Sequence, residues 1–191
     1  MVWGKVYMRP GTFRSNWITD LGKYVGLEIE SIDTQTVPNY KDIFPLGKTP
    51  ALVTEDGFKL TETISIYLYV IKNSTKPEFA GIKLNEKATN LKWLLFFNSD
   101  FISAGVQVLW GSTEEEKAKG HEKVQSYIDY FDNELKNRET KYLSSDEILV
   151  GDIFVYKLFK QFEEFGLSIE EKEHIGSYLE SLKEHPLIAS K

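Results

Sequence analysis

The chain has 191 residues, an apolar fraction of 41% and a net charge of −6, which allow one large or two small domains with a buried core. The spread acidic charge, without a run of Lys and Arg, argues against direct binding of nucleic acid. Because the chain has no cysteine, disulfides, thiolate metal sites and a cysteine nucleophile are excluded.

The N-terminal third carries a strand-helix-strand pattern. Residues 5–8 predict a short buried strand. Apolar residues at spacings of three and four over 13–25 predict a helix that Gly26 ends. Residues 27–32 resume as a second strand, so these segments together predict a parallel crossover unit.

A hairpin and a buried helix are predicted next. Residues 34–43 are polar and predict an irregular loop. The Asp56-Gly57 turn between short apolar runs at 49–53 and 58–60 predicts a β-hairpin. An apolar helix follows from Thr61, so residues 1–73 predict a thioredoxin-like α/β domain.

The remainder of the chain predicts helices only. Residues 74–86 begin with turn-forming side chains and are interpreted as a linker to an all-helical domain over 87–191. Thr113 and Glu116 have the spacing of a capping box, and His185-Pro186 is expected to stop the last helix. The predicted helices cover residues 86–109, 113–138, 151–165 and 170–184.

Cofactor and membrane signals are weak. The three histidines are far apart and lack ligand-like spacing, so no metal is expected. The most apolar helix is too short to span a bilayer, and the N-terminus lacks a signal-peptide pattern. We therefore expect a soluble cytoplasmic protein.

This order of parts, with Thr49-Pro50 before the hairpin and Glu62-Thr63 at a helix start, resembles the cytosolic glutathione transferase fold over essentially the whole chain. The resemblance implies a thioredoxin-like domain followed by a helical domain, with a cis bond before Pro50. It also implies that the backbone N–H and C=O of Thr49 bind the cysteinyl part of glutathione.

A narrower resemblance concerns the gamma subunit of translation elongation factor 1, in its fungal form. Residues 7–14, 44–51, 56–62 and 92–100 are similar to its glutathione-transferase-like domain. That resemblance implies a scaffold that organises the guanine-nucleotide-exchange complex, with the other elongation factor 1 subunits as partners and a homodimer as the expected assembly.

Two departures from the family pattern stand out. The core helix begins after Leu149, where a Ser or Thr cap is expected, and losing such a cap costs about 1 kcal/mol. Asp152 remains placed to stabilise the helix start through the dipole. Gamma subunits continue into a lysine-rich linker, so a chain ending at Lys191 is interpreted as an excised domain or a stand-alone relative.

The resemblance assigns a glutathione half-site to Glu62, Thr63, Thr49, Pro50 and Lys48. The carboxylate of the γ-glutamyl group would lie on the helix N-terminus and the Thr63 hydroxyl, and Glu62 would pair with its ammonium. The other interpretation is a capped helix with a favourable acid. Residues 48–50 also have two interpretations. In the first, the backbone at Thr49-Pro50 binds the peptide and Lys48 contacts its glycine carboxylate; in the second, the segment is only an exposed turn before the hairpin.

The catalytic position is assigned to Thr12 and Arg14. Transferases of this family steady the glutathione thiolate with a Tyr, Ser or Cys after the first strand, where this chain offers Tyr7, Thr12 and Ser15. Tyr7 is expected in the core. Thr12 would donate to the thiolate with Arg14 adding positive charge, although the pattern favours Thr12 as the N-cap of the helix predicted from Phe13.

Two functions therefore stay open. The first is the elongation-factor scaffold with residual glutathione binding. The second is a stand-alone glutathione transferase, whose electrophilic substrate would contact rings such as Phe101 or Trp110. The ring-rich helix over 86–109 predicts either a dimer face or a thick helical core.

Overall fold

The computed structural model describes residues 2–167, 169 and 172–189. The chain divides into two units, Met1–Ala80 and Gly81–Lys191. This division lies inside the predicted linker, of which Pro77–Ala80 forms the 3₁₀ turn η2, with Phe79 and Ala80 buried. The domain boundaries given above stay a prediction.

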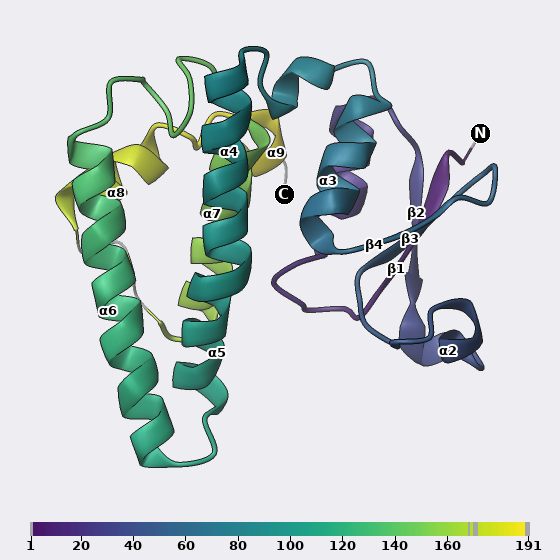
Figure 1. The fold of residues 1–191 in the computed structure, drawn as a ribbon, viewed down its shortest axis with the longest axis horizontal. Helices are drawn as coiled ribbons and strands as arrows, with labels where there is room; N and C mark the ends of the chain where they lie inside the picture. The colour runs from purple at the N-terminus through teal and green to yellow at the C-terminus, as the bar shows by residue number, and fades with distance from the viewer. Residues whose placement is uncertain (1, 168, 170–171, 190–191) are drawn as a thin grey trace. The chain divides into compact units, whose positions relative to one another are not determined.

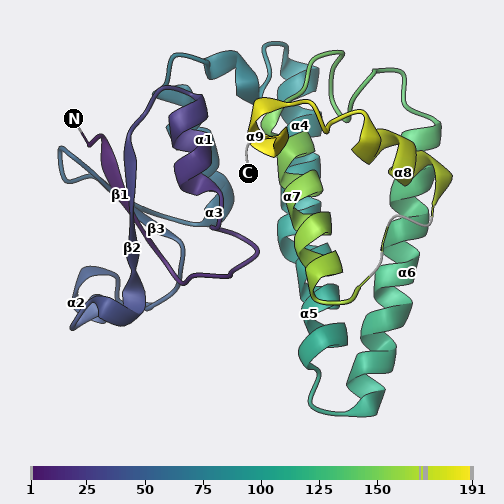
Figure 2. The same ribbon diagram turned by 180° about the vertical axis from the view of Figure 1, so that it is seen from behind.

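The first unit is a mixed sheet with helices packed against it (Figures 1 and 2). The strand order is β2-β1-β3-β4, with β1 and β2 parallel and the other pairs antiparallel, as a thioredoxin-like domain requires. Its elements are β1 (Gly4–Met8), α1 (Ile18–Tyr24), β2 (Ile29–Asp33), η1 (Thr34–Thr36), α2 (Tyr40–Ile43), β3 (Ala51–Thr54), β4 (Lys59–Thr61) and α3 (Thr63–Lys72).

The first helix begins later than predicted. Residues 13–17 form turns, and α1 starts at Ile18 after Trp17. Phe13 and Trp17 are buried, as the apolar periodicity predicted, but they lie in turns. Their spacing of four residues therefore resembles one face of a helix although no helix is formed there. The interpretation of Thr12 as a helix N-cap is therefore wrong.

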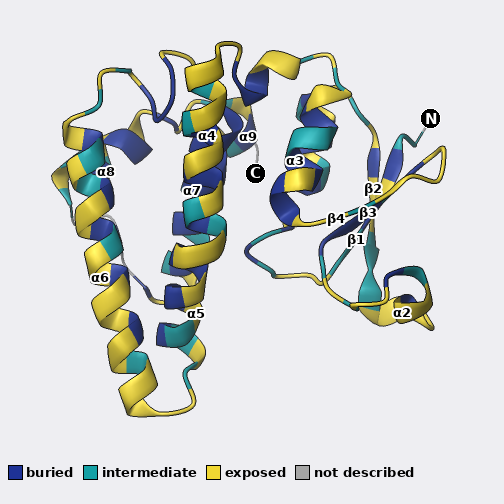
Figure 3. Cartoon of the chain, in the orientation of Figure 1, coloured by how far each residue is buried: buried dark blue, intermediate teal, exposed yellow. Residues whose placement is uncertain are grey.

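The second unit consists of helices around an aromatic core. Figure 3 shows buried residues along each of these helices, alternating with exposed ones. Fully enclosed rings from three helices contact one another, as between Phe97 and Phe159 at 5.5 Å and between Phe131 and Phe159 at 5.9 Å. Its elements are α4 (Leu84–Phe96), η3 (Phe97–Phe101), α5 (Ile102–Trp110), α6 (Glu114–Lys136), α7 (Val150–Glu164), α8 (Glu173–Glu180) and α9 (Pro186–Ala189).

The helix predicted over 86–109 is interrupted. Residues Phe97–Phe101 form a π-helical segment between α4 and α5. Phe97 and Phe101 are both fully buried there, whereas Trp110 is 55% exposed. Phe101 belongs to the core and is unavailable to a substrate, which corrects that expectation.

The predicted capping box at the start of α6 is confirmed, whereas the predicted stop at His185-Pro186 is wrong. The N–H of Glu116 donates to the Thr113 hydroxyl at 3.1 Å, and its carboxylate accepts from the N–H of Ser112 at 2.7 Å. His185-Pro186 does not end the helical structure, because Pro186 opens α9 at the first helical position, where a missing N–H costs nothing. The predicted helix over 170–184 is observed as Glu173–Glu180, and Glu170 and Glu171 lie outside the described residues.

Gly105 in α5 packs directly against a ring of α7. A Cβ at this position would lie 2.4 Å from both Cε1 and Cζ of Phe162. An exposed helical Gly→Ala change stabilises by about 1 kcal/mol, but overpacking a core costs about 1–3 kcal/mol. Gly105→Ala is therefore expected to lower the free energy of unfolding, measured by urea denaturation.

The ring itself supplies the control for this prediction. In the double variant Gly105→Ala with Phe162→Leu, the added methyl group has room, so the two losses are expected to be less than additive. An increase in stability on Gly105→Ala alone would contradict the close packing of α5 and α7.

Candidate functional site

The sheet register brings two of the predicted site segments together. Ala51 pairs with Thr61 in the antiparallel β3–β4 ladder. Extending that register by one residue places Pro50 beside Glu62, so the turn before β3 and the start of α3 are neighbours. Tyr7 of β1 pairs with Ala51, so the segment that follows β1 starts at the same end of the sheet.

The N-terminus of α3 offers open donors. Its first intrahelical bond runs from the N–H of Ile66 to the carbonyl of Glu62 at 2.9 Å, and no described side chain caps the helix. The three preceding N–H groups therefore point out of the helix without intrahelical partners. Thr63 is 2% exposed at the first helical position, and the Glu62 side chain is exposed beside it.

The backbone of Glu62 is held in an unusual conformation. Its φ of 70° and ψ of 118° lie outside the regions that an L-residue adopts readily. Among the described non-glycine residues, Asn39 alone shares a positive φ, and asparagine tolerates it. Such strain persists only where the surroundings fix it, and it is concentrated at functional sites.

The turn before β3 presents an unpaired backbone edge. The Thr49–Pro50 peptide bond is cis, as the family resemblance implied. No residue of the described chain hydrogen-bonds to the N–H or C=O of Thr49. The side chain of Lys48 is exposed, whereas Pro50 is buried and anchors the turn.

A tyrosine that the sequence did not single out supports this turn. The Tyr40 hydroxyl of α2 donates to the carbonyl of Lys48 at 2.8 Å. The Tyr40 ring packs at 5.8 Å from Tyr7 and 5.6 Å from Phe44. Burial, and the neighbouring Tyr7 hydroxyl, raise the pKa of Tyr40 above its usual value, so it remains a donor at neutral pH. No sequence signal indicated this contact, because residues 34–43 were interpreted as irregular.

Thr12 and Arg14 lie in the turn between β1 and α1, which Figures 1 and 2 show as the dark loop leaving β1. The Thr12 side chain is partly exposed, and its hydroxyl is hydrogen-bonded to that of Ser15. Ser15 itself is fully buried.

Arg14 is tied to the start of α3. Its carbonyl accepts from the Tyr67 hydroxyl of α3 at 2.6 Å. Burial lowers the pKa of its guanidinium, while Tyr67 and Glu62 act in the opposite direction. Since Glu62 is close enough to influence Arg14, the structure brings the predicted catalytic turn and the predicted half-site to one place.

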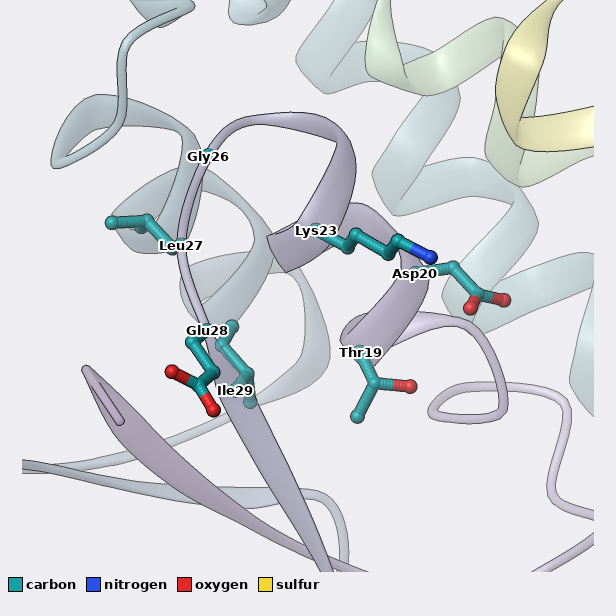
Figure 4. Close-up of a pocket in the computed structure, with 7 residues that line it drawn as sticks. All are labelled: Thr19, Asp20, Lys23, Gly26, Leu27, Glu28 and Ile29. Atoms are coloured by element: carbon teal, nitrogen blue, oxygen red, sulfur yellow. The ribbon is translucent and has the colours of Figure 1, made fainter. Parts of the chain in front are cut away.

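A separate surface depression lies elsewhere on the first unit. It has a volume of about 430 Å³ and lies between α1 and residues 26–29 (Figure 4). Its polar lining mixes Asp20 and Glu28 with Lys23. It contains none of the seven predicted site residues.

Metal-binding clusters and membrane-spanning helices are both absent from the part of the chain that the structure describes. No group of three or more His, Asp and Glu side chains is arranged to hold a metal ion. None of the described helices is both long and apolar enough to cross a lipid bilayer.

Known sequence families match both units. The profile described as the N-terminal domain of glutathione S-transferase matches residues 2–72, and the profile of its C-terminal domain matches residues 99–190.

Individual relatives match over most of the chain. Glutathione S-transferase Y-2 of Pichia kudriavzevii is 36% identical over 190 residues, which are 98% of each chain. A crystal structure of a glutathione S-transferase from the same organism superposes with a TM-score of 0.89 at 43% identity, covering 99% of this chain and 95% of that one. Elongation factor 1-gamma of Schizosaccharomyces pombe is 30% identical over 185 residues, which are 92% of this chain and 44% of that protein.

Proposed function

The chain belongs to the glutathione S-transferase family, and from this membership we propose that it is a transferase that conjugates glutathione to an electrophilic substrate. The motifs alone favoured the elongation-factor scaffold. The comparisons favour the transferase, because this chain is 36% identical to glutathione S-transferase Y-2 over 190 residues and 30% identical to elongation factor 1-gamma over 185 residues.

The observation that carries the proposal is the open backbone of Thr49 beside the uncapped start of α3. The γ-glutamyl carboxylate would accept from the N–H groups and hydroxyl at Thr63, and the exposed Glu62 would bind the ammonium. The cysteinyl backbone would pair with Thr49 as an added strand does. Lys48 would reach the glycine carboxylate of the bound tripeptide.

The chemistry requires a nucleophilic sulfur. The thiol of glutathione releases its proton to solvent, and the thiolate is stabilised by the Thr12 hydroxyl with the positive charge of Arg14 nearby. The sulfur then attacks the electrophilic carbon and forms the new C–S bond, and the leaving group departs with the electron pair of the bond that breaks. With a chlorinated dinitrobenzene the leaving group is chloride.

Binding and turnover test the proposal separately. Titration calorimetry with glutathione measures occupancy, and conjugation of chlorinated dinitrobenzene measures turnover. We expect both from the wild-type chain. Absence of binding at millimolar glutathione would refute the enzyme, and binding without conjugation of any electrophile would leave only an inherited binding site.

Tyr40→Phe probes the support of the Thr49 turn. The change removes the bond to the Lys48 carbonyl and keeps the ring, so the loss of one neutral hydrogen bond is expected to weaken glutathione binding about three- to tenfold. Calorimetry measures it. Tyr24→Phe, a tyrosine of α1, is the control and should leave the affinity unchanged; equal effects of both variants would contradict a specific role for Tyr40.

The elongation-factor scaffold is the second candidate. The similarity of residues 92–100 and the 30% identity to elongation factor 1-gamma support it. Co-purification with the exchange-factor subunit of that complex tests it. If the wild-type chain co-purifies with that subunit and does not bind glutathione, the result would favour the scaffold over the enzyme.

We also propose a cytoplasmic homodimer. An apolar stripe on α4 supports self-association, because Leu84, Leu91 and Leu95 are 80%, 37% and 48% exposed at spacings of seven and four residues.

A further inference from the structure

A buried serine lies behind the hydroxyl assigned to the thiolate. Ser15 has no exposed surface, and its side-chain oxygen is hydrogen-bonded to the Thr12 hydroxyl. No other described residue contacts the Ser15 hydroxyl through a hydrogen bond. The turn itself is fixed by the bond from the N–H of Ile18 to the Ser15 carbonyl at 3.1 Å.

Burial decides which hydroxyl donates. If Thr12 donated to Ser15, the Ser15 proton would have neither a protein acceptor nor water, and an unpaired buried donor is costly. If Ser15 donates, its proton has an acceptor in the partly exposed Thr12 hydroxyl. The Thr12 proton is then free to point away from the core.

We propose that Ser15 is a positioning residue that donates its proton to Thr12, so that Thr12 directs its own O–H to the sulfur of bound glutathione. This relay rests on the proposed function. A hydroxyl that accepts a hydrogen bond becomes a stronger donor, by about 10–30% per bond in a chain. Ser15 therefore acts through Thr12 and never touches the ligand.

Other charged and titratable groups near this turn also influence the thiolate. Arg14 is half-buried in the same turn, and Glu62 and Tyr67 of the α3 segment interact with it. The Tyr67 hydroxyl donates to the Arg14 carbonyl. Burial raises the pKa of Tyr67, so it stays neutral. None of these groups is altered by a change at Ser15.

The readout is the pKa of the glutathione thiol in the complex, followed by the ultraviolet absorbance of the thiolate. Thr12→Val is expected to raise it by about 1–2 units, the value of a charge-assisted hydrogen bond. Ser15→Ala is expected to raise it by about 0.1–0.6 unit, which is 10–30% of the Thr12 contribution, and to lower kcat/KM for the electrophile by up to about fourfold below that pKa. Below that pKa, where glutathione is bound as the thiol, its dissociation constant should be unchanged in Ser15→Ala.

A double variant and a neighbouring residue complete the design. In the Thr12→Val background, Ser15→Ala should leave the thiol pKa unchanged, because its route to the sulfur is gone. Asn16→Ala changes an exposed side chain of the same turn and should have no effect. Thermal denaturation should show Thr12→Val destabilised and partly restored by Ser15→Ala, because the buried donor is then removed.

The outcomes separate the relay from the function it rests on. If Ser15→Ala binds glutathione normally and leaves the thiol pKa unchanged, the relay is overturned and the transferase proposal survives. An additive effect of Ser15→Ala in the Thr12→Val background also overturns it. If the wild-type chain binds no glutathione, the proposed function falls and the relay to a thiolate falls with it.

Discussion

Replacing Glu62 with glutamine is expected to weaken glutathione binding about 10- to 100-fold. The change removes the charge that would pair with the γ-glutamyl ammonium and keeps the shape of the side chain, and charge-assisted hydrogen bonds are worth about 1.5–3 kcal/mol. Glu62 is exposed at the start of α3, so its carboxylate is available to a ligand. Calorimetry gives the affinity, and conjugation kinetics should show the loss mainly in KM.

The matched control is Glu55→Gln. Glu55 is also exposed and lies in the β3–β4 turn of the same unit, so the variant makes the same change in net charge. We expect its affinity to equal that of wild type. A comparable loss in both variants would mean that the overall charge, rather than a contact at Glu62, governs binding.

Glu62→Gly separates binding from stability. Glycine adopts the positive φ of 70° at this position without steric cost, which removes about 1–3 kcal/mol of strain. Its greater freedom in the unfolded chain offsets about 1 kcal/mol of that gain. The variant should therefore be as stable as wild type or more so in urea denaturation, while binding falls as in Glu62→Gln.

Asp152→Asn is expected to lower the free energy of unfolding by about 3 kcal/mol at neutral pH. The Asp152 carboxylate is fully buried and accepts from the N–H groups of Leu143 at 3.0 Å and Leu149 at 2.9 Å and from the Tyr178 hydroxyl at 2.8 Å. An amide has one acceptor oxygen, so its NH₂ group would face a buried donor, and each unsatisfied buried group costs about 1–3 kcal/mol.

Two variants frame this result. Asp100→Asn changes an exposed carboxylate of the same unit and should leave denaturation unchanged. Tyr178→Phe removes one of the three donors and keeps the ring, so about 1 kcal/mol is expected. Should Asp152→Asn be as stable as wild type, the carboxylate would not hold the start of α7.

The same residue gives stability a pH dependence of known sign. Burial raises the pKa of Asp152 to about 6, against the hydrogen bonds that lower it. Between the unfolded value near 4 and about 6, the folded chain holds a proton that the unfolded chain releases. The stabilisation of the folded state by this bound proton is present in full below about pH 4 and is lost as the pH rises through 6. In wild type, the free energy of unfolding from urea denaturation should therefore fall between about pH 4 and 6. Asp152→Asn should lack this fall.

The local pattern predicted most of the fold. The alternating strands, the Asp-Gly hairpin and the helical periodicity specify short segments through neighbours in sequence, and they indicated a thioredoxin-like half followed by helices. The pattern failed at residues 13–17, where buried side chains project from turns and imitate a helix face. It also missed α2, whose Tyr40 is buried by residues distant in sequence.

By itself the sequence determined the order of most elements, because turn and strand signals are local. The family resemblance assigned Thr49-Pro50 and Glu62-Thr63 to one half-site, and the β3–β4 register makes them neighbours. The tertiary structure decided what buried polar groups do. Asp152 reaches past its own helix to Leu143 and Tyr178, Asn90 of α4 accepts from the N–H of Gly151, and Ser15 is enclosed behind Thr12. The partners of a buried polar group are set by packing between distant segments, which no local pattern encodes.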